Sequence, residues 1–412
     1  MPAQIEILAP AGSCESLMAA INAGADSVYF GVENLNMRAR NSNNFSLEDL
    51  AKITALCKEK NVKSYLTLNT IIYDSEMEQM QRIVDAAMQN KIDAIIASDM
   101  AVLNYARKKS VELHASTQLN ISNIEAVEFF SAYCDVMVLA RELSIFQVAD
   151  IIKEIEKRQI KGPSGNLVKI EIFCHGALCM APSGKCYMSL HHYNHSANRG
   201  ECFQICRRGY LARDLETDEE LVIDNKYIMS PKDLCTIEFL DKIMEAGISV
   251  LKIEGRARAP EYVKTAVECY KQARDSYLNG TWSEQEAKML KEKLGMVFNR
   301  GFWDGYYLGA KLGEWSDVHG TKSARTKIYL GKVTNYFAKI KVAEITFETG
   351  EELLAGEDIL IIGSTTGVLE QKAAELRENE KNVSKVQKSS IFSMPVKELV
   401  RRGDKLYKFK TT

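Results

Sequence analysis

The chain has 412 residues, of which 46% are hydrophobic and 26% charged. These proportions are typical of globular proteins with two or three domains, and they exclude a disordered or fibrous chain. No apolar run reaches the ~18 to 20 residues that span a bilayer, and the N-terminus lacks the basic head and apolar stretch of a signal peptide. Because ten cysteines occur without an export signal, we expect a cytoplasmic protein whose thiols bind metal or catalyse rather than form disulfides.

The net charge of -2 conceals an asymmetry along the chain. Residues 321–412 contain 17 Lys and Arg against 12 Asp and Glu, whereas the first 320 residues contain 36 against 43. A basic C-terminal region on an acidic body indicates a polyanionic partner such as RNA. A lysine-rich surface facing solvent explains the same charge equally well.

Short apolar runs typical of β-strands alternate with helical patterns through the first 255 residues. Such repeated units imply parallel strands joined by right-handed crossovers, hence an α/β domain. Eight strands favour a (β/α)8 barrel over a doubly wound sheet, because no Gly-x-Gly-x-x-Gly turn follows the first strand. The predicted strands are residues 5–8, 27–30, 64–68, 94–97, 112–115, 136–139, 169–173 and 249–253.

The C-terminal region has a different sequence pattern. Helical patterns over residues 260–277 and 283–293 are followed by β-rich segments at 327–333, 338–347, 358–362, 385–391 and 405–409. We therefore predict a TIM-like barrel domain over residues 1–320, with its trailing helices, and a small all-β barrel over residues 321–412.

Polar residues follow most of the predicted barrel strands, at the end where such barrels place their active sites. Several arginines there favour a small anion such as a dicarboxylate or phosphate, with Arg38, Arg141 and Arg256 as candidate substrate-binding residues. The candidate catalytic residues at the same ends are His175, Glu254, Asn69 and Gln118. Each could instead be a solvated cap or part of a salt bridge, for example between Arg256 and Glu254.

A long cysteine-rich insertion, about residues 174–235, separates the last two predicted strands, and an insertion of this length at the active face is usually functional. Four cysteines fall within 28 residues of loop-like sequence: Cys179, Cys186, Cys202 and Cys206. Convergent thiolates in a reducing compartment most often hold a metal. Their spacing permits zinc but gives a modest preference for an iron–sulfur cluster, with Cys174 and Cys235 as reserve ligands.

The histidines of the insertion do not form a recognisable hydrolase motif. His191 and His195 could share a helical face, but the general-base glutamate of His-Glu-x-x-His is missing, so we expect an exposed polar loop. A cysteine-protease pair of Cys174 with His175 is sterically poor, because neighbours on a strand point to opposite faces.

The run EIFCHGALCMAPSGKCYMS, residues 171–189, resembles the signature of the U32 collagenase-like peptidase family. Similar motifs occur at residues 8–12, 24–29, 140–144, 198–207 and 252–256, so the resemblance covers most of the chain. Pro182 and the histidine-rich residues 191–195 depart from the family pattern, and both lie near the proposed cysteine site.

By size and motif order the chain is similar to the family members that hydroxylate tRNA uridine 34 with prephenate. The resemblance implies an oxygen-independent hydroxylase that forms 5-hydroxyuridine at this wobble position, with tRNA as partner and prephenate, a small dicarboxylate, as co-substrate. It implies that the C-terminal barrel contacts the RNA backbone. It also implies a 4Fe–4S cluster with Cys179, Cys186, Cys202 and Cys206 as its ligands.

Three other functions stay open at this point: a peptidase, a hydroxylase of another RNA, and a non-catalytic RNA-binding protein that carries a cluster. A peptidase needs a nucleophile with its base, a carboxylate pair or a hydrolytic metal with an open position. The sequence presents no convincing set of this kind.

Overall fold

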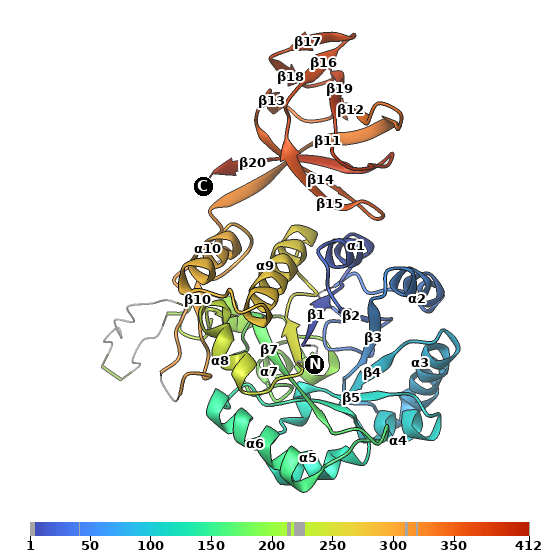
Figure 1. The fold of residues 1–412 in the computed structure, drawn as a ribbon, viewed down its shortest axis with the longest axis vertical. Helices are drawn as coiled ribbons and strands as arrows, with labels where there is room; N and C mark the ends of the chain where they lie inside the picture. Colours follow the sequence, from blue (N-terminus) through green and yellow to red (C-terminus); the bar gives the residue numbers. More distant parts are fainter. Residues whose placement is uncertain are drawn as a thin grey trace.

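The structure is a computed structural model that describes residues 5–40, 42–211, 216–217, 227–309, 312–318 and 320–411. Eight parallel strands form a closed ring, because β7 pairs with β9 and β9 pairs with β1 (Figure 1). This confirms the predicted (β/α)8 barrel. The ring strands are β1 (Glu6–Pro10), β2 (Ser27–Gly31), β3 (Lys63–Leu68), β4 (Ala94–Ala97), β5 (Leu113–Ala115), β6 (Val136–Val138), β7 (Lys169–Ala177) and β9 (Val250–Ile253).

The strands and helices form where the sequence pattern places them. The ring strands are almost entirely buried because helices cover them outside and side chains fill the barrel inside. In the helices one apolar face is buried, as with Met80, Ile83, Val84 and Ala87 of α3. The helices are α1 (Cys14–Asn22), α2 (Leu50–Glu59), α3 (Met77–Gln89), α4 (Met100–Lys108), α5 (Ile124–Ser131), α6 (Ile145–Arg158), α8 (Leu240–Glu245), α9 (Pro260–Leu278) and α10 (Glu284–Gly295).

The insertion between β7 and β9 adds structure at the mouth of the barrel. It contains α7 (Met188–Tyr193) and β8 (Asp233–Cys235), and β8 pairs antiparallel with residues 175–177 of β7. A later strand, β10 (Phe302–Trp303), pairs with β8. β7 is therefore longer than the predicted strand, because its last residues have β8 as a partner. The sequence did not predict β8 or β10, because two or three residues show no periodicity.

The C-terminal region forms antiparallel sheets around its own apolar core, which includes Leu330, Phe347 and Phe392. Two predicted strands were wrong in extent, because Lys341 and Ser389 have positive φ and turn the chain inside the predicted ranges 338–347 and 385–391. The strands are β11 (Arg325–Phe337), β12 (Val342–Phe347), β13 (Glu352–Leu354), β14 (Asp358–Gly363), β15 (Gly367–Lys372), β16 (Leu376–Glu378), β17 (Lys381–Val383), β18 (Lys385–Gln387), β19 (Ile391–Pro395) and β20 (Lys405–Thr411).

The C-terminal domain sits on the helices that flank the start and the end of the barrel, α1, α9 and α10 (Figure 1). Ala19 of α1 belongs to one apolar cluster with Leu360, Ile362 and Val368. The Lys327 ammonium lies 2.7 Å from the Glu261 carboxylate in the first turn of α9. These contacts fix the small domain beside the barrel mouth. Within the described residues, no helix combines the length and apolar character needed to cross a bilayer.

Candidate functional site

A cavity of about 160 Å³ opens at the carboxyl ends of the barrel strands. This is the end at which the sequence predicted the site. Side chains from the strand ends and from the insertion line it together. Among the predicted site residues, the cavity is lined by Arg38, Asn69, Gln118, Arg141, Glu254, Arg256, Cys179, Cys202 and Cys206.

An ion pair between Arg38 and Glu254 forms one wall of the cavity. The Arg38 guanidinium donates to Glu254 Oε1 from Nη2 at 2.5 Å and from Nε at 3.2 Å, and the Tyr29 hydroxyl lies 3.2 Å from Oε2. Burial alone would raise the pKa of Glu254, but Arg38, with Arg141 and Arg256 beyond it, lowers the pKa to about 2. Glu254 is therefore an ionised partner of Arg38 at neutral pH, which does not suit a general acid or base.

Arg256 does not pair with Glu254, contrary to the salt-bridge alternative. Its Nη1 donates to Asn36 Oδ1 at 3.0 Å and to Thr67 Oγ1 at 2.7 Å. Burial lowers the pKa of Arg256 to about 10. The neutral oxygens around it leave the guanidinium charge uncompensated by direct contact, so it adds positive potential to the cavity.

Arg141 has unused hydrogen-bonding capacity in the cavity. Its Nη1 donates to the Ala177 carbonyl at 3.0 Å, and its guanidinium lies 3.8 Å from the centre of the Phe173 ring. Its Nε is buried without a hydrogen-bond partner, and no carboxylate of the described residues forms an ion pair with it. Because a buried, unpaired donor is costly, this guanidinium is the best placed of the three predicted arginines to bind an anion.

Three polar side chains form a connected set after β3 and β5. The Asn69 amide donates to Ser116 Oγ and to Gln118 Oε1, each at 3.2 Å, and its Oδ1 accepts from the Met37 backbone N–H. Ser116 also donates to Gln118 Oε1. The amides thus present fixed donors and acceptors, which can recognise the edge of a planar polar ring.

A buried ion pair that the sequence did not predict lies in the barrel. Lys252 Nζ lies 2.6 Å from Glu171 Oε1, with the two side chains 6% and 0% exposed, and 4.7 Å from the centre of the Tyr29 ring. Lys252 and Tyr29 line the cavity. The sequence contains a signal for this pair, because a charged residue within a strand that is buried on both sides needs an oppositely charged partner.

The insertion is held over the mouth by specific contacts. Arg199 donates to Glu76 Oε2 at 2.7 Å, and the Arg40 guanidinium lies 3.6 Å from the centre of the Phe203 ring. The Asn120 amide donates to the Ser183 carbonyl at 3.3 Å. These contacts tie the insertion to the loops after β3, β2 and β5, respectively, and three of its cysteines, Cys179, Cys202 and Cys206, line the cavity.

Cys186 and Cys206 each interact electrostatically with other members of the cysteine cluster. Burial raises the pKa of the Cys206 thiol to about 11. Arg207 lowers this pKa, whereas Cys179, Cys202 and Cys186 each raise it. The Cys186 pKa is raised by burial and further by Cys179 and Cys202. Within the described ranges, no three or more His, Cys, Asp or Glu side chains are arranged to hold a metal ion.

Other predicted candidates lie away from the cavity. Cys174 and Cys235, the reserve ligands, are buried in the apolar core. His175, predicted as catalytic, is also buried, with its ring 5.8 Å from Tyr262 and 5.4 Å from Tyr270. Burial lowers the pKa of His175 to about 3, so it is a neutral core residue. The reason is the irregular pairing of β7 with β9 between Phe173 and His175, which changes the direction of the side chain.

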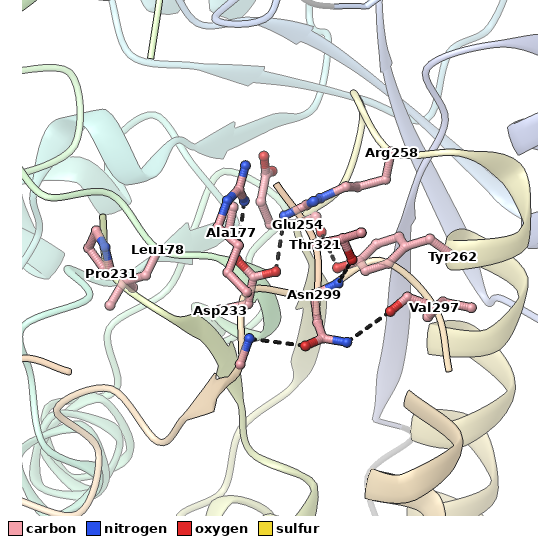
Figure 2. A network of polar contacts seen from close by, with 12 residues as sticks. Ala177, Leu178, Pro231, Asp233, Glu254, Arg258, Tyr262, Val297, Asn299 and Thr321 are labelled. Atoms are coloured by element: carbon pink, nitrogen blue, oxygen red, sulfur yellow. Dashed lines mark hydrogen bonds and ion pairs between the residues drawn. The ribbon is translucent and has the colours of Figure 1, made fainter. Parts of the chain in front are cut away.

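A network behind the cavity braces Glu254 and the end of β7 (Figure 2). The Tyr262 hydroxyl donates to the Glu254 carbonyl at 2.8 Å, and Arg258 donates to Asp233 Oδ2 at 3.0 Å. Arg207 donates to the carbonyls of Leu178 and Pro231. Asp233 is 1% exposed and also pairs with Arg300, so a single carboxylate holds two arginines.

Comparison with known proteins agrees with this architecture. The sequence model of Peptidase family U32 matches residues 12–317. A Porphyromonas gingivalis protein named Collagenase is 57% identical over 404 residues, which are 98% of this chain and 97% of that protein. The tRNA hydroxylation protein P1 of Bacillus subtilis is 31% identical over 84% of this chain and 82% of its own length. A 23S rRNA 5-hydroxycytidine synthase of Escherichia coli is 32% identical over 92% of this chain and 56% of that protein.

The Arg38–Glu254 pair makes the stability of the fold depend on pH. Because the pKa of Glu254 falls from 4.5 to about 2 on folding, its contribution is present above pH 4.5 and is lost as the pH falls toward 2. We predict that Glu254→Gln lowers the free energy of unfolding at pH 7 by about 3 kcal/mol, and that this difference shrinks below pH 4.5. Urea unfolding of both proteins across this pH range measures it.

The matched control is Glu375→Gln, which removes the partner of the surface residue Arg377. It should change stability by less than about 0.5 kcal/mol at each pH. A Glu254→Gln difference that stays constant from neutral to acid pH would contradict the assignment.

Proposed function

The chain belongs to peptidase family U32, and on this basis we propose that it is an iron–sulfur-dependent RNA hydroxylase that forms 5-hydroxyuridine at tRNA wobble position 34 with prephenate. The observation that carries the proposal is that three of the four clustered thiols, those of Cys179, Cys202 and Cys206, line one cavity together with Arg141 and the amide set. Relatives whose names state tRNA or rRNA hydroxylation support an enzyme that acts on RNA.

The thiols of the insertion suit an iron–sulfur cluster in their chemistry, whereas the side chains of the described residues, as they stand, form no metal site. Cys179, Cys186, Cys202 and Cys206 would hold a 4Fe–4S cluster, which would supply one-electron chemistry beside the cavity. Burial raises the pKa of the Cys206 thiol, Arg207 opposes that rise, and Cys179, Cys202 and Cys186 add to it. Four soft sulfur donors near fixed cations are the ligand set that such clusters require.

Arg141 and Arg256 are the proposed binding residues for prephenate. A dicarboxylate needs two cationic contacts, and a guanidinium with free N–H groups binds a carboxylate in a bidentate manner. Arg141 lines the cavity with its guanidinium bonded to a backbone carbonyl, and Arg256 has neutral partners. Arg38 has a different role, because its charge is already neutralised by Glu254.

The amide set is the proposed reader of the target base. Asn69 and Gln118, which follow β3 and β5, present donors and acceptors in the same cavity as Arg141 and Arg256. Enzymes that modify a base take it out of the stack and bind its Watson–Crick edge by hydrogen bonds. Side-chain amides suit uracil, whose edge has both acceptors and a donor.

A peptidase is the second candidate, because the relatives at 57% and 52% identity are named Collagenase. The cavity argues for the hydroxylase. No histidine is among the described residues that line it, and Glu254 is held as a carboxylate by Arg38. A peptidase would require the purified protein to cleave gelatin, at a rate that the cysteine variants below leave unchanged.

The test of the proposal is nucleoside analysis of tRNA and rRNA from a deletion strain of the host. We expect loss of 5-hydroxyuridine and its derivatives from tRNA, restored by a plasmid copy of the wild-type chain. A modified rRNA nucleoside lost instead would move the substrate to another RNA. A nucleoside profile identical to that of the parent strain would reject hydroxylation of RNA.

The cluster ligands are tested by single substitutions. We predict that Cys179→Ala or Cys206→Ala removes the visible absorbance, the bound iron and the hydroxylation together, since each removes one ligand. Protein purified without oxygen, assayed for iron and sulfide, provides the measurement. Cys57→Ala, in the core, and Cys14→Ala, at an exposed site, are the controls and should retain full iron. Full iron in either ligand variant would show that other residues hold the metal.

The role of Arg141 is tested by a conservative change. Arg141→Lys keeps the charge but removes the planar donors, so we expect the KM for prephenate to rise about tenfold or more. Arg208→Lys is the matched control, because Arg208 also lies over an aromatic ring, that of Tyr193, but does not line the cavity. Steady-state kinetics against prephenate concentration measure both, and an unchanged KM in Arg141→Lys would contradict the assignment.

A further inference from the structure

A second cavity adjoins the first and extends to the C-terminal domain. It has a volume of about 470 Å³ and shares Arg38, Ala177, Gln204 and Glu254 with the mouth of the barrel. We name it the interdomain groove, and its distinctive lining residues are Arg258, Phe298, Arg300, Arg325, Lys327 and Phe409. The Arg38–Glu254 pair is therefore the wall between the groove and the cavity, and Figure 2 shows Glu254 beside Arg258.

The groove has an excess of positive charge. Among the described residues that line it, five are cationic, and four carboxylates pair with them, so one positive charge remains at Arg258 and Arg300; the carboxylates are Glu254, Glu261, Glu370 and Asp233. Arg258 and Arg300 share one carboxylate, Asp233, at 3.0 and 3.4 Å. Burial and the neighbouring Arg258 lower the pKa of Arg300 to about 10, which shows that its charge is poorly compensated. An anion bound here would relieve that repulsion.

Planar side chains lie beside the charged groups of the groove. The Arg258 guanidinium lies 3.9 Å from the centre of the Phe298 ring, and the Arg325 guanidinium lies 3.8 Å from the centre of the Phe409 ring. Phe298 and Phe409 are only partly buried. Guanidinium planes and aromatic rings are the surfaces on which unpaired bases stack, whereas a free phosphate or carboxylate does not stack on them.

Both domains contribute to the groove. Arg258, Phe298 and Arg300 come from the barrel side, whereas Lys327 and Phe409 come from β11 and β20. The contacts of α1 with β14 and β15 fix the two sides relative to each other. The groove therefore exists only because the small domain is attached at this place.

We propose that the interdomain groove binds the unpaired RNA segment next to the target nucleotide, with Arg258 and Arg300 against a phosphate and the planes at Phe298 and Phe409 against bases. The identity of the ligand as RNA rests on the proposed function. The target base would enter the cavity on the far side of the Arg38–Glu254 pair, while the adjacent nucleotides stay in the groove. The fused C-terminal domain thus completes a single-strand site that the barrel alone lacks.

The experiment measures binding of a fluorescein-labelled oligouridylate to the full chain by fluorescence anisotropy, at several salt concentrations. The main variant is Ala257→Glu, which adds a carboxylate to the groove at an exposed position and leaves the ion pairs of the groove in place. We expect its Kd to be about tenfold weaker than that of the wild type. Ala374→Glu, exposed on the C-terminal domain outside the groove, is the control and should bind as the wild type does.

A second variant tests, through the salt dependence of Kd, whether Arg300 neutralises a phosphate of the RNA. For single-stranded RNA, the slope of log Kd against log salt falls by about 0.7 for each phosphate that a cationic side chain no longer neutralises, so Arg300→Gln should show this change. The wild type should also bind the oligouridylate more tightly than the same strand in a duplex with oligoadenylate, because paired bases cannot stack on the groove. Photocrosslinking of oligo-4-thiouridylate to the wild type should label peptides that contain Phe298 or Phe409.

Wild-type affinity and salt slope in both Ala257→Glu and Arg300→Gln, or crosslinks elsewhere only, would overturn the proposal. The experiments distinguish rejection of RNA binding in the groove from rejection of the proposed hydroxylation. Unchanged nucleosides in the deletion strain, together with impaired binding in the variants, would reject the hydroxylation and keep the groove. Absence of 5-hydroxyuridine from that strain, together with unimpaired binding in the variants, would reject the groove alone.

Discussion

The buried ion pair between Arg38 and Glu254 is the interaction on which the site depends. It connects the loop after β2 to the end of β9, which are 216 residues apart in the chain. Because both charges are largely withdrawn from water, neither can be left without the other at low cost. The pair fixes the Tyr29 hydroxyl and forms the common wall of the cavity and the interdomain groove.

The arginines around this wall differ in function because they differ in partners. Arg38 is neutralised by a carboxylate, Arg256 is held by neutral oxygens, and Arg141 keeps a buried donor free. Arg258 and Arg300 divide one carboxylate between them. Binding capacity for anions thus remains at two places, inside the cavity and along the groove, and these are the places where a small dicarboxylate and an RNA backbone are proposed to bind.

The cysteine-rich insertion belongs to the same arrangement. Contacts such as Arg199 with Glu76 and Arg40 with Phe203 hold it against the barrel loops, so its thiols stand at the rim of the cavity. A redox centre at this rim would lie between solvent and the bound base, within a largely preorganised set of polar groups. Two relatives of the family carry names that state tRNA or rRNA hydroxylation, and others are named Collagenase.

The sequence alone determined the barrel, the polar strand ends and the cysteine quartet, because these follow from local periodicity, composition and spacing. It could not determine which charges pair. Arg38, predicted to bind substrate, is the partner of Glu254, and His175, predicted to catalyse, is turned into the core by an irregularity in β7. The Lys252–Glu171 pair and the groove between the domains were also missed. These features arise where segments distant in the chain meet, so only the tertiary structure decided them.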